Sequence, residues 1–238
     1  GLSQGYQDQN NDNRLYGKTL MNINEDLIIK NKSYYTSGSL GFNYVFNDRH
    51  SVGATYEVNI NPYSRGGWNS LMDVWKNGSK TESYTNDMYC RFKSRPTQDI
   101  TAYYAGQIGK VSIEWNGEIY LRKTGQTQYS EETGIEGGDS RTIESDFTAD
   151  SWMHASKLVL SFPVWKGTLK VGNEFTESCR ANLYTIDEQG TDLPGKTDDQ
   201  VKESNLAAFV SYGLRLNKVE LNAGLRYEHV SSNYYNTG

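Results

Sequence analysis

Residues 205–229 show a two-residue alternation over two stretches, with an unbroken apolar face and a mostly polar or small other face, and the two stretches meet at a turn at Asn217 and Lys218. Successive residues of an extended strand point to opposite faces of a sheet, so this pattern predicts a β-hairpin with one apolar and one polar face. The apolar face carries Leu206, Ala208, Val210, Tyr212, Leu214, Leu216, Val219, Leu221, Ala223, Leu225 and Tyr227. The hairpin must therefore separate two very different environments.

The same alternation recurs earlier in the chain. Including the hairpin it predicts eight strands, and the apolar faces of these strands carry no charged residue, with Asn173 as the main polar exception. The predicted strands are residues 40–46, 52–60, 100–108, 111–121, 158–162, 169–175, 206–216 and 219–227. With 18 Tyr, 4 Pro and no sustained helical periodicity, the chain has an all-β composition.

The connections between these strands alternate in length. Short turns are predicted at residues 47–50, 109–110, 163–167 and 217–218, and long polar loops at residues 62–98, 125–143 and 187–201. Short turns on one side and long loops on the other are typical of outer-membrane β-barrels. Residues 111–121 are long enough to cross a hydrocarbon core, which a tilted strand does in roughly 9–11 residues. The predicted fold is an antiparallel up-and-down transmembrane-type β-barrel, of which this chain is a segment.

A soluble antiparallel β-sandwich also alternates, with its apolar face buried in a core. Sandwich strands are usually shorter, about 5–6 residues, and their connections rarely keep a strict short and long rhythm. We therefore favour the barrel. The alternative is a soluble or surface-exposed sandwich that binds a carbohydrate or peptide, and an enzyme comes third.

The segment AGLRYEH at residues 223–229 resembles the barrel strands of outer-membrane TonB-dependent receptors of Gram-negative bacteria, in particular the outer-membrane protein beta-barrel family. Residues 102–121 and 156–175 are similar to such strands more weakly. The resemblance implies a receptor that lies in outer-membrane lipid and imports a scarce nutrient, with the TonB system and a surface lipoprotein as partners. Residues 1–238 would then form one β-barrel segment, an excerpt without the signal peptide, plug and C-terminal strands of such a receptor.

Charge and hydropathy fit this interpretation. A mean hydropathy of −0.74 excludes a helical membrane protein, whereas a barrel needs no long apolar run. The net charge of −5 and the pI near 5.3 argue against nucleic acid as a partner.

Few residues suggest a chemical site. Cys90 and Cys179 are predicted to be isolated, half-buried thiols, the three histidines show no paired spacing, and we expect no zinc site, cofactor or catalytic residue. Acidic pairs and clusters such as Asp146 with Asp150 and Asp198 with Asp199 are interpreted as solvated loop charge. Aromatic residues in the longest predicted loop could stack on a sugar or clasp a peptide: Tyr63, Trp68, Trp75, Tyr84 and Tyr89. Such residues more often pack a loop onto itself.

The first 33 residues are harder to place. Residues 5–13 are polar and predict a loop, and residues 15–23 predict one further strand.

Overall fold

The computed structural model describes residues 2–15, 21–188, 195–216 and 219–236. Within these ranges every regular element is a β-strand. In the same ranges, no helix has the length and apolar character to cross a membrane. The strands are β1 (Leu2–Leu15), β2 (Met21–Asn47), β3 (His50–Lys76), β4 (Ser79–Ser94), β5 (Thr97–Ile108), β6 (Val111–Glu136), β7 (Arg141–Val164), β8 (Gly167–Glu188), β9 (Lys196–Leu216) and β10 (Val219–Asn236).

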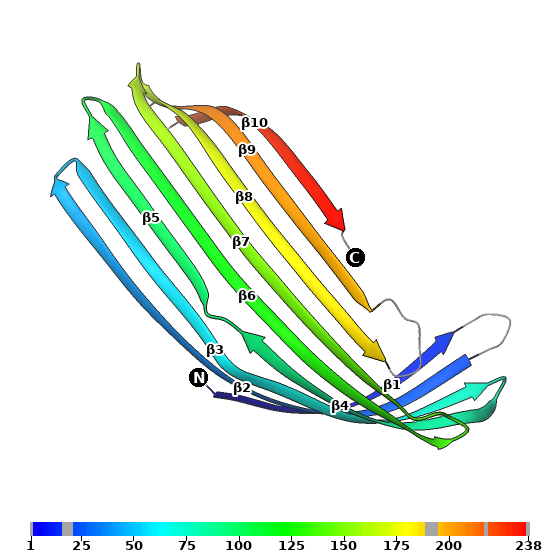
Figure 1. Ribbon diagram of the computed structural model, residues 1–238. Helices are drawn as coiled ribbons and strands as arrows, with labels where there is room; N and C mark the ends of the chain where they lie inside the picture. The colour runs from blue at the N-terminus through cyan, green and yellow to red at the C-terminus, as the bar shows by residue number, and fades with distance from the viewer. Residues whose placement is uncertain (1, 16–20, 189–194, 217–218, 237–238) are drawn as a thin grey trace.

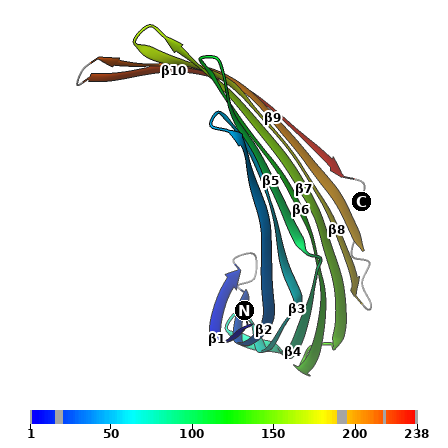
Figure 2. The same cartoon turned by 90° about the vertical axis from the view of Figure 1, so that its left-hand side faces the viewer.

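These strands form one antiparallel sheet, in which neighbours in sequence are neighbours in space (Figure 1). Strands β4 and β5 both lie between β3 and β6, so they are the two halves of one broken strand. The sheet is a curved wall whose two edges, β1 and β10, do not pair with each other in the described residues (Figure 2). The predicted up-and-down β-barrel segment is confirmed.

Two prolines mark the place where the wall bends. Strand β4 ends before Arg95 and Pro96, and proline has no N–H for the ladder. On the neighbouring β3, Thr36 pairs with Ile60 but Tyr34 pairs with Tyr63, so one extra residue is inserted beside Pro62. Such bulges kink a strand and strengthen its twist. Beyond them β2, β3 and β4 turn away from the direction of the main wall (Figure 1).

The register gathers the predicted apolar residues on one side of the wall. One row of directly paired residues crosses the sheet from β2 to β10 through Tyr44, Val52, Tyr104, Trp115, Leu158, Asn173, Ala208 and Tyr227. We call this side the apolar face and the other side the polar face.

The apolar face is open rather than buried. Leu40, Leu225 and Tyr227 are 77%, 78% and 70% exposed, whereas the small polar-face residue Ala207 is 1% exposed. No second layer of described residues covers the apolar side chains, as a sandwich would require. A surface this apolar needs an apolar solvent, because soluble proteins rarely expose such a contiguous patch. The sandwich alternative is therefore wrong.

The short turns at residues 47–50, 109–110 and 163–167 are confirmed, and the turn at Asn217 and Lys218 lies outside the described residues. The prediction of three long polar loops needs correction. Residues 62–98 continue β3 to Lys76 and return as β4, and most of residues 125–143 belong to β6 and β7. The loop at 187–201 is likewise shortened, because β8 runs to Glu188 and β9 starts at Lys196. The strands continue because their backbones still pair after the apolar pattern has ended.

The N-terminal predictions also need correction. Residues 5–13, predicted as a loop, lie within β1, which pairs with β2. The single strand predicted for residues 15–23 is instead the end of β1 and the start of β2, with Leu15 opposite Met21 and residues 16–20 outside the described ranges.

Candidate functional site

A groove of about 390 Å³ runs across the polar face over β3, β5, β6, β7 and β8. Small residues such as Gly53 and Ala155 leave room for it. The polar residues that line it from the polar face are Thr55, Thr101, Tyr103, Asn116, Glu118, Lys157, Glu174 and Thr176. A surface that mixes hydroxyl, amide and charged groups can hydrogen-bond a polar solute without selecting one sign of charge.

Tyr103 fixes one end of this groove. Its ring covers Gly53, where a Cβ would lie 2.4 Å from the ring, and its hydroxyl lies 3.2 Å from Asn43 Oδ1 as a hydrogen-bond donor. The glycine is needed here because any side chain would occupy the position of the ring.

An ion-pair network lies at the other end of the groove and crosses four strands. Glu174 on β8 accepts contacts of 2.5 Å from Lys157 Nζ on β7 and from Arg226 Nη2 on β10. Arg226 Nε also lies 2.5 Å from Glu228 Oε1. Arg226 reaches Glu174 above β9 because the residue between them is the small Ala207, which pairs with both Glu174 and Glu228.

Phe209 lies among these charges. Lys157 Nζ is 5.8 Å and Arg226 Cζ 5.9 Å from its ring centroid, within the range of cation–π attraction. A single exposed ion pair contributes little to the free energy of folding, but a network of ion pairs around the Phe209 ring has a defined geometry. The cluster therefore presents a preorganised charged surface beside the groove.

Gly172 makes this position of Phe209 possible, and a methyl group there should be costly. A Cβ at residue 172 would lie 2.4 Å from Phe209 Cζ and 2.6 Å from the Leu158 carbonyl oxygen. We expect Gly172→Ala to lower the free energy of unfolding by about 1–3 kcal/mol, as overpacked sites do. Urea unfolding in lipid checks this. Gly38→Ala is the control, because its nearest neighbour is Val58 Cγ1 at 3.9 Å; equal effects at both positions would contradict the explanation.

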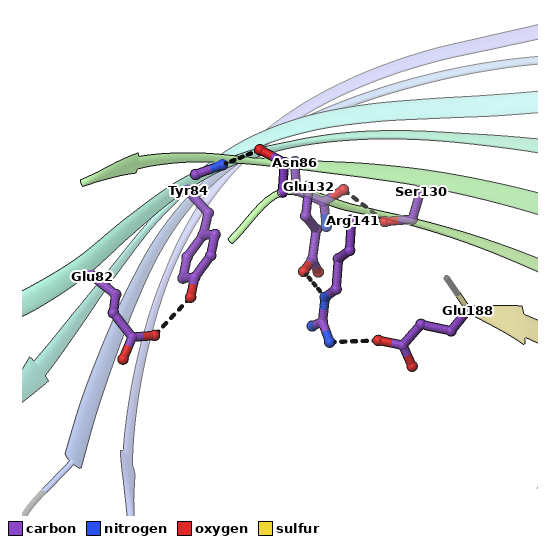
Figure 3. A network of polar contacts seen from close by, with 9 residues as sticks. Glu82, Tyr84, Asn86, Ser130, Glu132, Arg141 and Glu188 are labelled. Carbon is purple, nitrogen blue, oxygen red and sulfur yellow. Dashed lines mark hydrogen bonds and ion pairs between the residues drawn. The ribbon is translucent and has the colours of Figure 1, made fainter. Parts of the chain in front are cut away.

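A second polar cluster lies under the arch of the extended strands, beyond the apolar band (Figure 3). Arg141 Nε is 2.5 Å from Glu132 Oε2 and its Nη1 is 2.7 Å from Glu188 Oε1. The Glu188 side chain is 2% exposed and that of Glu132 is 10% exposed, so Arg141 compensates two nearly buried carboxylates. The hydrogen bond to Glu132 raises the pKa of Arg141 above its already high value. This cluster ties β6, β7 and β8 together outside the band.

The tip of the β3–β4 hairpin has its own charge pairs. Lys80 lies 2.8 Å from Asp73 Oδ1, and Lys76 2.7 Å from Glu82 Oε1. Hydrogen bonds from Lys80 and Ser83 lower the pKa of Asp73, and those from Lys76 and Tyr84 lower the pKa of Glu82. Both carboxylates therefore favour the folded hairpin when ionised.

Acid should loosen this hairpin. A carboxyl group whose pKa is lowered in the folded state stabilises that state at any pH above its unfolded-state pKa, which is about 4. This stabilisation is lost as the pH falls through the folded-state pKa. Between about pH 6 and about pH 3 we expect faster hydrogen exchange at the hairpin tip, after correction for intrinsic rates. The effect should be small because solvent screens these groups. The variant Lys76→Met/Lys80→Met should show a smaller pH dependence, to which only the hydrogen bonds from Ser83 and Tyr84 still contribute. An unchanged pH dependence would show that other groups are responsible.

The five predicted ligand aromatics do not form one cluster. Trp68 and Tyr84 lie on the polar face, because their partners Met88 and Met72 share the alternation of that side. Tyr89 and Trp75 lie on the opposite side by the same alternation, and only the backbone of Tyr63 belongs to the described part. The five residues therefore do not share one face, and a binding role stays a prediction for each of them.

Sequence reasoning missed Lys157, Glu174, Phe209 and Arg226 as a group. They lie far apart in the chain, and single-strand alternation shows only that each is on a polar face. The pairing of Lys157 with Glu174 and of Phe209 with Arg226 brings them together. The only sequence signal for this cluster was the presence of opposite charges on one predicted face.

The two cysteines are free, as predicted, and buried rather than half-buried. By alternation Cys90 on β4 lies on the polar face and Cys179 on β8 on the apolar side. Burial raises the pKa of the Cys90 thiol. No group of three or more His, Cys, Asp or Glu side chains in the described ranges is arranged to hold a metal ion.

The comparison with protein-family models agrees with this fold. The sequence model of the outer membrane protein beta-barrel family matches residues 109–238, more than half of the chain. No curated protein sequence matches the chain significantly.

Among solved structures, the chain is similar to the unliganded ferric citrate transporter FecA, at 7% identity and a TM-score of 0.33, over 99% of this chain and 38% of that one. It is also similar to BauA, the ferric preacinetobactin receptor from Acinetobacter baumannii, at 11% identity and a TM-score of 0.35, over 98% of this chain and 52% of that one. The chain thus spans 38% and 52% of the lengths of these two chains. From its matching segment and its open apolar face, this chain belongs to the outer membrane protein beta-barrel family and lies in the outer membrane.

Proposed function

We propose that this chain forms part of the barrel wall of a TonB-dependent receptor, which imports a scarce nutrient and has no enzymatic activity. The polar-face groove carries the proposal, because its lining of hydroxyl, amide and paired charged groups suits passage or binding of a polar solute. By resemblance, the TonB system would supply energy and a surface lipoprotein would assist capture.

The lengths of the strands support an orientation. Beyond the apolar band β3 and β4 continue to a turn at Asn77 and Gly78, and β6 and β7 continue to residues 137–140. On the other side the strands return at once through two-residue turns such as Asp48–Arg49. Outer-membrane barrels place short turns in the periplasm, so the extended ends would face the outside of the cell.

A tag inserted after Asn77 should therefore be labelled by antibody on intact cells. The same tag inserted between Asp48 and Arg49 should be labelled only after the outer membrane is opened. Flow cytometry of intact and permeabilised cells measures both. Labelling of the Asp48 site on intact cells, in a protein that has folded correctly, would reverse the orientation.

The receptor role needs a separate experiment. A strain without the gene should grow poorly on one limiting nutrient, and the intact gene should restore growth only when TonB is active. Normal growth of the deletion strain on every candidate nutrient would remove the receptor role and leave the barrel. Variants of the groove, such as Asn116→Leu with Thr176→Val, should reduce uptake of that nutrient while the amount of protein in the membrane stays constant.

A further inference from the structure

A second hollow lies on the polar face, at the end of the wall where β7 turns into β8 (Figure 1). Its volume is about 720 Å³, and its lining comes from this turn and from the adjoining parts of β8, β9 and β10. Glycine backbone forms part of its surface in place of side chains. A Cβ at Gly167, for example, would lie 2.2 Å from the Gly213 carbonyl oxygen, so a larger residue would push the two strands apart.

The charged groups that line this hollow are mostly cationic. Lys166, Lys170 and Arg215 are exposed, and Glu220, opposite Arg215 in the ladder, is the one carboxylate among the described lining residues. In the part of the chain that the structure describes, no carboxylate lies within ion-pair distance of these three cations, whereas the cations beside the groove are paired with Glu174. The hollow is therefore positive in a chain of net charge −5, and we call it the basic pocket.

The turn between β7 and β8 fixes the place of Lys166. The Tyr212 hydroxyl donates a hydrogen bond of 3.1 Å to the Val164 carbonyl oxygen, and the Arg215 N–H donates one of 3.4 Å to the Lys166 carbonyl oxygen. Trp165 has a φ of 50°, which is rare for a bulky residue and persists only where neighbouring contacts hold it. Lys166 Nζ lies 5.6 Å from the centroid of the Trp165 ring. These contacts hold the turn against β9 and place Lys166 beside Arg215.

The spacing of the lysines suits a ligand with more than one anionic group. Lys170 follows Lys166 by four residues, which is about 13 Å along an extended chain, and both side chains are long and flexible. Thr168, Ser211 and Asn222 line the same pocket and offer hydroxyl and amide hydrogen bonds. The volume lies within the range of about 300–1,000 Å³ that is typical of small-molecule sites. The pocket therefore fits a small solute rather than a folded partner.

We infer that the basic pocket binds a small molecule that carries two or more carboxylate or phosphate groups, and that the nutrient of the proposed receptor belongs to this class. Arg215 can bind such a group through two parallel hydrogen bonds, and each lysine binds it as a point charge. The inference rests on the proposed function, in which the short turns face the periplasm. The basic pocket would then lie at the periplasmic end of the barrel interior, where its positive field attracts an anionic solute from the groove.

Calorimetric titration of the intact protein in non-ionic detergent, at constant ionic strength, tests the binding. Pyrophosphate and tricarballylate are the probes for phosphate and carboxylate groups. At least one of them should bind at least ~10-fold more tightly than acetate, which has one anionic group, and glucose, which has none. The tighter probe identifies the anionic group that the basic pocket prefers. Binding of neither probe, or equal binding of glucose, would overturn the inference.

Substitutions place the binding in the basic pocket. Lys166→Gln/Arg215→Gln should weaken binding of the tighter probe at least ~10-fold, and Glu220→Gln should strengthen it by about 2–3-fold because a repelling carboxylate is removed. The control Arg49→Gln/Lys110→Gln removes two exposed cations from the other short turns and should stay within about 2-fold.

Heat-dependent migration on gels shows whether each variant is folded. If the double glutamine variant of the pocket does not fold, Lys170→Gln replaces it and should weaken binding at least ~3-fold. Unchanged binding by the pocket variants, weaker binding by Glu220→Gln, or an equal loss in the control would overturn the inference, since each of these results places the anion elsewhere.

The growth experiment on the deletion strain separates this inference from the proposed function. A TonB-dependent nutrient with fewer than two anionic groups would overturn the substrate class and leave the receptor role standing. Normal growth of the deletion strain on every candidate nutrient, with pyrophosphate or tricarballylate still bound in the basic pocket, would remove the receptor role and leave the anion site.

Discussion

Val210→Arg is expected to destabilise the protein folded in a lipid bilayer by about 2–4 kcal/mol, the cost of a cationic side chain near the midplane of a barrel. Val210 lies within the apolar band and pairs directly with Val171 and Leu225, which are 40% and 78% exposed. An arginine there must either face hydrocarbon or distort the surrounding lipid. Urea-dependent unfolding from vesicles measures the difference.

The next residue along β9 is a matched control. Ser211 lies on the polar face between Lys170 and Gly224, where water can reach a charge. Ser211→Arg should cost at most about 1 kcal/mol, mostly from repulsion by Lys170. If both substitutions cost the same, the apolar face does not contact lipid.

Arg141→Met should lower the stability of the extended strands by about 2–3 kcal/mol. The change leaves Glu132 and Glu188 as nearly buried carboxylates without their shared cation (Figure 3). Breaking a fully buried pair costs about 3–5 kcal/mol, and the smaller value is expected because the Arg141 side chain is 47% exposed. Hydrogen-exchange protection near residues 130–143 and 186–188 reports the loss.

Two controls separate charge from packing. Arg180→Met removes a guanidinium whose Nε lies 2.9 Å from Asn182 Oδ1 on the exposed surface, and it should change stability by less than about 0.5 kcal/mol. Adding Glu132→Gln and Glu188→Gln to Arg141→Met should restore much of the protection. If the triple variant is as unstable as the single one, lost packing of the Arg141 side chain, rather than uncompensated charge, is the cause.

The local pattern of the sequence was sufficient for the membrane-facing part of the fold. In residues 205–229, for example, the two-residue period assigns each side chain to a face, and the register of β9 with β10 confirms that assignment. The short turns could be predicted for the same reason, since a break between two alternating runs marks where the chain reverses. The contrast between the two faces is strong only where one of them contacts lipid.

Beyond the lipid that contrast disappears, and the prediction failed there. Residues 62–98 look like a loop because β3 and β4 lie beyond the apolar band there and need no apolar period. Their strands persist through backbone hydrogen bonds, which any residue except proline can donate. Pro96 shows the exception, since the strand that contains it is broken into β4 and β5.

The sequence by itself determined which side chains face lipid, because alternation is a property of each strand alone. Only the tertiary structure decided which residues meet across strands. Glu174 reaches Arg226 because register places the small Ala207 between them, and Lys166 lies beside Arg215 because the turn before β8 is hydrogen-bonded to β9. Register depends on pairings between distant segments, and a single strand carries no record of its partner.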